Sequence, residues 1–129
     1  MPTSNRPLSP FMLGPHYKPQ LTSMLSILHR LTGAALAVGL LLLTWFLFAV
    51  LAGEHAFSIF RDFRESFIGQ VMLFGWLFSF VYHFFNGLRH LAWDMVLGLS
   101  IKATYITGYI VVIFSVIATV WIWMHMGGK

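Results

Sequence analysis

The chain has 129 residues, of which 58% are hydrophobic and only 9% are charged, and its formal net charge is +4. This composition excludes an ordinary soluble domain and predicts an integral membrane protein. The cationic side chains are few and spread along the connecting segments, which argues against a nucleic-acid-binding protein. The sequence has no cysteine, so thiolate ligands for iron, a covalently attached c-type haem and disulfides are excluded.

Three segments are free of charged side chains for longer than the about 20 residues that a spanning helix needs, namely 31–53, 66–88 and 103–128. We therefore predict an all-α membrane protein that forms a single domain over residues 1–129. Its transmembrane helices are expected at about 22–53, 66–90 and 103–126.

The segments outside these spans have their own patterns. Residues 1–20 are rich in proline and predict an irregular N-terminal arm. Thr22 or Ser23 is expected to cap the first helix, because a hydroxyl accepts hydrogen bonds from free backbone amides. The connector EHAFSIFRDFRESF spaces phenylalanines three and four residues apart among charges. That spacing fits a short amphipathic segment at the membrane interface, and a plain polar connector fits equally well.

The cationic side chains indicate an orientation. Three spans place the N-terminal segment and the second connector on one side, with five cations, and the first connector and C-terminus on the other, with three. The positive-inside rule then predicts a cytoplasmic or matrix N-terminus. The two sets are Arg6, Lys18, Arg30, Arg89 and Lys102, and Arg61, Arg64 and Lys129.

His83 is the histidine that lies deepest within a predicted span. His83, Gly87, His90 and Asp94 follow at i, i+4, i+7 and i+11, so they share one face of a helix. Polar groups at such depth face a bundle interior, where they have a partner or a role. The missing side chain at Gly87 is expected to open a slot for a flat ligand beside the deeper imidazole.

A haem fits such a slot, because a neutral imidazole is an axial iron ligand and the macrocycle needs apolar walls. We expect the walls at Trp76, Phe80 and Phe84, and the propionates near His90, Arg89 and the basic end of the first span. The alternative is that His83 only hydrogen-bonds across helices. If two histidines hold the iron, the second must come from a partner membrane subunit; Met72 or Met95 is the internal alternative.

A second polar group begins the first span, in the stretch SILHRLTG. Ser26, Gly33 and either His29 or Arg30 share one face. An arginine near a span end commonly extends to the membrane surface. A hydroxyl and a fixed cation at this place also suit a quinone carbonyl, since donors stabilise the negative charge that develops on reduction.

Taken together, RPLSP (6–10), SILHRLTG (26–33) and HFFNGLRHLAWD (83–94) resemble the signatures of the cytochrome b large membrane-anchor subunit of succinate dehydrogenase, respiratory complex II. The similarity covers essentially the whole chain. It implies three spans that pack with a small anchor subunit, and a complex completed by an iron-sulfur subunit and a flavoprotein subunit. It further implies haem b and ubiquinone as the bound redox groups.

The resemblance also implies roles for individual residues. His83 matches the axial haem b ligand, the other ligand being a histidine of the small anchor. Ser26 and Arg30 match the ubiquinone site. His29, Arg30 and His90 match positions close to the haem propionates, and Asp94 matches a position near the quinone pocket.

The function implied is electron transfer from succinate to ubiquinone by the assembled complex. The alternatives are a quinol-oxidising anchor of a fumarate reductase and a haem-free structural anchor. A channel subunit is disfavoured, because the third span has few polar side chains. We expect a multi-pass protein of the bacterial inner (cytoplasmic) membrane, with the N-terminus cytoplasmic, and favour this over the mitochondrial inner membrane.

Overall fold

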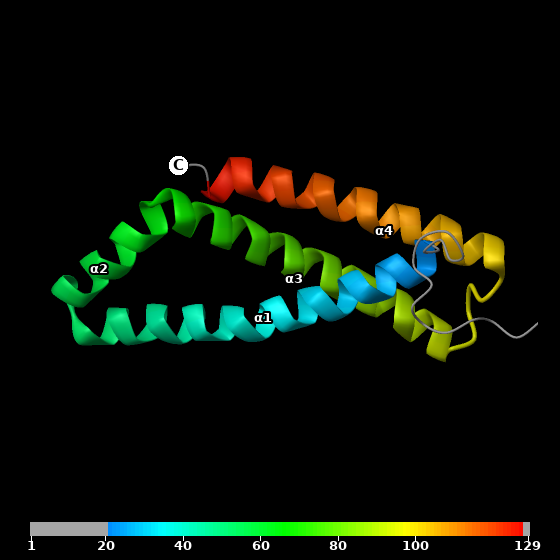
Figure 1. Cartoon of the computed structure of the whole chain (residues 1–129), viewed down its shortest axis with the longest axis horizontal. Helices are drawn as coiled ribbons and strands as arrows, with labels where there is room; N and C mark the ends of the chain where they lie inside the picture. Colours follow the sequence, from blue (N-terminus) through cyan, green and yellow to red (C-terminus); the bar gives the residue numbers. More distant parts are fainter. Residues whose placement is uncertain (1–20, 128–129) are drawn as a thin grey trace, which may run out of the picture.

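The computed structural model describes residues 21–127, and every secondary-structure element in this range is a helix. Figure 1 shows α3 running between α1 and α4, while α2 joins α1 to α3 at one end of the molecule. The elements are α1 (Leu21–Ala52), α2 (Glu54–Glu65), α3 (Phe67–Asp94), α4 (Ile101–Ile122) and a terminal π-helical turn, η1 (Trp123–Gly127).

Within residues 21–127, three helices are long and apolar enough to cross a membrane: Ser23–Ala52, Phe67–Asp94 and Ile101–Met126. The predicted all-α membrane fold with three spans is therefore confirmed. The irregular arm expected at residues 1–20 lies outside the described residues.

Some helix boundaries differ from the prediction. Thr22 and Ser23 already belong to α1, so the cap expected there is wrong. The helix α3 continues past residue 90 to Asp94, because charged side chains at the membrane surface do not interrupt a helix. Serine caps start the later spans instead: Ser66 Oγ accepts a hydrogen bond from the Gly69 amide at 3.0 Å, and Ser100 Oγ accepts one from the Ala103 amide at 3.1 Å.

The first connector forms the helix α2, so the amphipathic interpretation is confirmed. Phe60 is buried, and its ring meets the Trp45 ring of α1 edge to face, with 5.0 Å between centroids. Phe63 packs on the same indole, also with 5.0 Å between centroids. The chain turns sharply between α1 and α2 at Gly53, whose φ of 106° favours glycine. The position of α2 at a membrane interface stays a prediction.

Leu25, Tyr82 and Val111 form the buried core where α1, α3 and α4 meet. The Tyr82 hydroxyl donates a hydrogen bond to the Leu25 carbonyl at 2.8 Å, and its side chain is fully buried. Large apolar side chains cover the outside of all three spans, as expected of surfaces that face lipid. Small polar residues, including Ser79, Ser115 and Thr119, lie inside instead.

Glycines let α1 and α3 approach closely. A methyl group at Gly39 would overlap the indole of Trp76, because its carbon would lie 1.5 Å from Nε1. A methyl group at Gly33 would lie 3.1 Å from Cε1 of His83. Rings from α3 therefore rest directly on the α1 backbone at two levels, and this sets the distance between the helices.

Gly39→Ala is expected to destabilise the fold by about 1–3 kcal/mol, because the added methyl displaces a large, partly buried ring. The matched control is Gly75→Ala, which adds the same methyl to a spanning helix where no atom lies within 4 Å. Thermal unfolding of the purified protein in detergent measures the difference. Equal losses in both variants would contradict this account of the α1–α3 contact.

Candidate functional site

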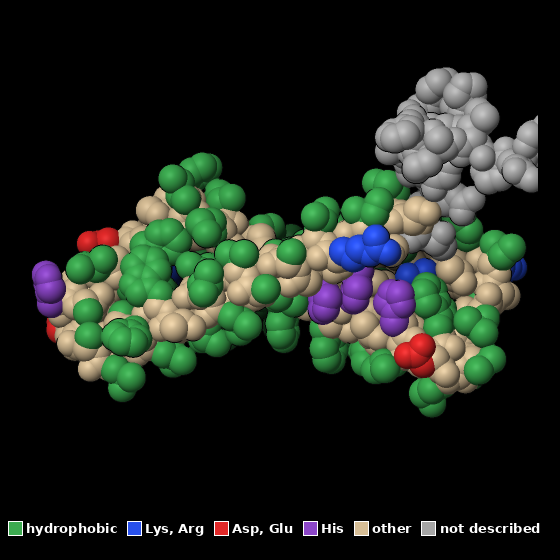
Figure 2. Space-filling view, turned by 60° about the horizontal axis from the view of Figure 1, so that its bottom comes forward, with side chains coloured by type: hydrophobic (Ala, Val, Ile, Leu, Met, Phe, Trp, Pro, Cys, Tyr) green, Lys and Arg blue, Asp and Glu red, His purple; other side chains and the backbone are tan. Residues whose placement is uncertain are grey.

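Three histidines come together where α1 crosses the C-terminal half of α3. His29 stacks on His83 with 4.0 Å between ring centroids and 5° between ring planes. His90 lies 5.1 Å from His29, again between centroids. Figure 2 shows histidine side chains gathered on one face of the molecule, beside cationic side chains. The predicted stripe on α3 thus gains a member from α1, although sequence spacing had linked only His83 and His90.

The hydrogen bonds of His83 define which ring nitrogen carries its proton. Nδ1 lies 3.2 Å from the carbonyl oxygen of His29 and 3.4 Å from Oγ1 of Thr32. The Thr32 hydroxyl itself donates to the His29 carbonyl at 2.9 Å, so its hydrogen is not available to His83. Both neighbouring oxygens therefore act as acceptors, which makes Nδ1 the donor and leaves a lone pair on Nε2.

This arrangement fits a haem ligand. Imidazoles that ligate metals usually donate their other N–H to a backbone carbonyl or a carboxylate, which fixes the ring and raises its basicity. His83 has that carbonyl partner. Gly33 has no side chain, so the His83 ring can lie directly against the α1 backbone. His29 does not supply the opposite axial ligand, because its ring lies face to face against His83.

The described residues do not complete a metal site by themselves. Within residues 21–127, no three His, Cys, Asp or Glu side chains converge to hold a metal ion. His29 Nδ1 is buried and has no hydrogen-bond partner in that part of the chain. A buried donor or acceptor without a partner is costly, and this nitrogen lacks a hydrogen bond that residues 21–127 do not supply.

The remaining members of the α3 stripe lie nearer its end. His90 is half-buried and meets the Trp93 ring edge to face, with 4.8 Å between centroids. Asp94 is exposed, and its carboxylate has no hydrogen bond or ion pair within residues 21–127. A methyl at Gly87 would meet nothing within 4 Å, so the space expected beside the stripe is present.

Two of the expected apolar walls are exposed. Phe80 and Phe84 are each about half exposed and stack with 6.4 Å between ring centroids. Trp76 instead packs on Gly39, beside a groove of about 400 Å³ between α1 and α3. The first two rings face outward and can receive a ligand or a partner helix, whereas the indole is already engaged within the chain.

Ser26 and Arg30 line one open pocket at the start of α1. With Ser23 and Ile27 they enclose about 390 Å³. The guanidinium of Arg30 is exposed and Ser26 is half-buried, so a hydroxyl and a cation are presented together one helical turn apart. This placement agrees with the pairing of Ser26 and Arg30 expected from the sequence.

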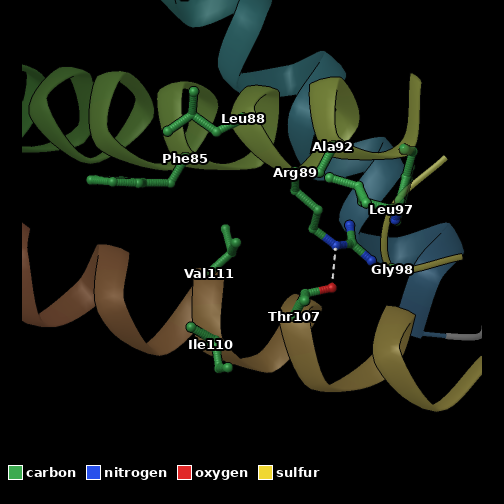
Figure 3. Close-up of a pocket in the computed structure, with 10 residues that line it drawn as sticks. Phe85, Leu88, Arg89, Ala92, Leu97, Gly98, Thr107, Ile110 and Val111 are labelled. Carbon is green, nitrogen blue, oxygen red and sulfur yellow. Dashed lines mark hydrogen bonds between the residues drawn. The ribbon is translucent and has the colours of Figure 1, made fainter. Parts of the chain in front are cut away.

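Arg89 does not join the histidines, and its expected contact with a propionate stays a prediction. Its guanidinium points to α4, as Figure 3 shows. Nε donates to Thr107 Oγ1 at 3.1 Å and Nη2 donates to the Thr104 carbonyl at 2.9 Å. Nη1 donates to Asn86 Oδ1 at 3.1 Å. Because Arg89 follows His83 by six positions, its side chain projects from α3 about 120° around the helix from that of His83.

Comparison with known proteins identifies the family. Residues 2–122 match the model of the succinate dehydrogenase/fumarate reductase transmembrane subunit. The chain belongs to this family. It is 39% identical over 121 residues to the succinate dehydrogenase cytochrome b556 subunit of Rickettsia prowazekii (strain Madrid E), covering 94% of this chain and 93% of that protein.

Two further relatives agree. The cytochrome b556 subunit of Paracoccus denitrificans is 35% identical over 116 residues, covering 90% of this chain and 88% of the relative. The cytochrome b560 subunit of Reclinomonas americana is 37% identical over 125 residues, covering 93% and 85%. The resemblance seen in the motifs is confirmed: the chain is a multi-pass, cytochrome b type membrane anchor that forms part of an oxidoreductase complex.

Sequence reasoning about this anchor missed two contacts of His83. Thr32 and the His29 carbonyl orient its ring, and neither appears in the helical stripe of α3. One signal was present: Gly33 follows His29 by one helical turn, and a glycine in a spanning helix marks a close approach by another helix. The sequence did not show which residue of α3 makes that approach.

The tautomer of His83 is testable in the anchor itself. We expect the Nδ1–H form to dominate in protein free of metal, because both nearby oxygens are acceptors. Nitrogen-15 NMR of histidine-labelled protein in detergent distinguishes the two forms, and His83→Gln identifies the signal. A predominant Nε2–H form would contradict the proposed orientation, since Nε2 would then carry the proton.

Proposed function

We propose that this anchor binds haem b together with a small anchor subunit, forms part of the site of ubiquinone reduction, and docks an iron-sulfur and a flavoprotein subunit of succinate dehydrogenase. The observation that carries the proposal is the hydrogen bond from His83 Nδ1 to the His29 carbonyl, at 3.2 Å. It leaves Nε2 of the deepest histidine without the proton, and so able to bind a metal. The cytochrome b names of the relatives support the same function.

In this function His83 would hold the haem iron from this chain, and a histidine of the small anchor would hold it from the partner. His29, Arg30 and His90 would then donate to the two propionates, and the rings of His29 and His90 lie 5.1 Å apart between centroids. When bound, haem b supplies a one-electron carrier within the membrane. The residues of the chain fix its position: Gly33 gives space to the ligand ring and the His29 carbonyl orients it.

Ser26 and Arg30 act on ubiquinone. Reduction to the quinol consumes two electrons, delivered one at a time by the iron-sulfur subunit, and two protons. The Ser26 hydroxyl donates a hydrogen bond to a quinone carbonyl, and the Arg30 cation stabilises the negative charge that develops on that oxygen. Asp94, exposed at the end of α3, lies at the same membrane surface and is available for proton transfer.

The orientation follows from charge. The histidine site and the Ser26–Arg30 pair both lie at the end where α1 begins and α3 ends. The positive-inside rule places that end in the cytoplasm of a bacterium. The soluble subunits would dock there. A fumarate reductase anchor would use the same residues in the opposite direction, and the family matched includes both enzymes. The relative rates of succinate oxidation and fumarate reduction by the purified complex distinguish them.

His83→Gln is expected to lower the haem content of the purified complex about tenfold or more, because an axial ligand is lost. His55→Gln serves as the control, since it removes an exposed histidine of α2. A pyridine haemochrome spectrum per mole of protein gives the measurement. Wild-type complex without b-type haem would rule out this role and leave the structural anchor.

Ser26→Ala and Arg30→Ala should each slow ubiquinone reduction, on the order of 10²-fold, because a donor to the developing charge is removed. Succinate oxidation by an artificial dye should persist, since the flavoprotein site is untouched. Ser58→Ala and Arg64→Ala are the matched controls on α2. Wild-type quinone kinetics in both variants of α1 would remove these residues from the site.

A further inference from the structure

Arg89 is a buried cation without an anionic partner among the described residues. Its side chain belongs to a residue that is 7% exposed, about 7 Å inside the end of α3. All acidic side chains of the sequence lie within residues 21–127, and the ion pairs there join Arg61 to Glu54 and Arg64 to Glu65. The partners of Arg89 are neutral oxygens, and they leave donor hydrogens on Nη1 and Nη2.

The surroundings of Arg89 add to its positive potential. It contacts the first turns of α4 through Thr104 and Thr107, and a helix N-terminus carries a partial positive charge. Lys102 lies in the same first turn of α4. A buried charge is stable only when it is paired, so this end of the α3–α4 contact calls for an anion.

The space beside Arg89 is shaped for a molecule with an apolar tail. A pocket of about 330 Å³ lies between α3 and α4 (Figure 3), and Arg89 is the charged residue in its lining. Towards the membrane centre the lining is apolar, with Phe85, Leu88 and Ile110. Leu88 and Ile110 are 47% and 58% exposed, so the pocket opens on the lipid-facing surface.

We propose that this groove binds an anionic phospholipid. The phosphate accepts hydrogen bonds from the free Nη1 and Nη2 donors of Arg89, near the N-terminus of α4. One acyl chain lies along Phe85 and Ile110. Basic pockets between transmembrane helices on the cytoplasmic side commonly bind acidic headgroups, and the positive-inside rule places Arg89 on that side.

A lipid fits this place better than a carboxylate of the small anchor. Arg89, which lines the groove, projects from α3 about 120° around the helix from His83. The small anchor is expected to cover the His83 face. The contacts of Arg89 with Thr104, Thr107 and Asn86 hold the cation in the groove, and the Trp93 ring lies 4.2 Å from its guanidinium carbon. The groove is therefore preformed within one chain.

The test uses the purified complex, depleted of lipid in detergent. Dioleoylphosphatidylglycerol and zwitterionic dioleoylphosphatidylcholine are titrated in turn, and native mass spectrometry counts the lipid that stays bound. Wild-type complex should prefer the anionic lipid about fivefold through this cation. Arg89→Gln should abolish that preference. Arg64→Gln, an exposed arginine of α2, should retain it.

A second variant covers the case in which Arg89→Gln fails to fold. Ile110→Trp keeps the cation and fills the apolar part of the groove, so it should weaken binding of both lipids. An unchanged anionic preference in Arg89→Gln or unchanged lipid binding in Ile110→Trp would overturn the proposal. Inorganic phosphate that binds as tightly as the phospholipid does would also overturn it, because the acyl chain would then contribute nothing. So would lipid binding by the isolated chain that is absent in the complex, since a partner residue would then fill the groove.

Discussion

The close contact between α1 and α3 is the constraint on which the rest of the structure depends. Lipid tails are as apolar as leucine, so the hydrophobic effect does not favour helix association within a bilayer. Tight packing and hydrogen bonds must do so. Gly33 and Gly39 provide the packing, because they let the His83 and Trp76 rings rest on the α1 backbone. The hydrogen bond from Tyr82 to the Leu25 carbonyl joins the same two helices.

The histidine site is a direct consequence of this contact. His83 reaches the His29 carbonyl because the glycine beside it adds no bulk. The stacked His29 ring and the Thr32 hydroxyl then leave the His83 imidazole one stable orientation. A wider spacing between the helices would leave a polar ring free in the membrane. The same packing that holds the bundle together therefore also fixes the orientation of the His83 ring.

The two polar faces of α3 have different neighbours. The histidine face meets α1, whereas Arg89 is held by α4. Periodicity predicted the first face correctly, since four polar or small positions repeat along one side of a helix. It did not predict the partner of Arg89, because the angle of a side chain around its own helix does not identify the helix that lies opposite.

The sequence by itself determined the three spans, their approximate ends, the amphipathic helix between the first two, and His83 as the deepest histidine. These follow from hydropathy and helical period, which are local properties. Only the tertiary structure decided the stacking of His29 on His83, the proton position on that ring and the groove at Arg89. Each depends on which residues of separate helices meet, and that is set by the distance and crossing of packed helices rather than by spacing along any one of them.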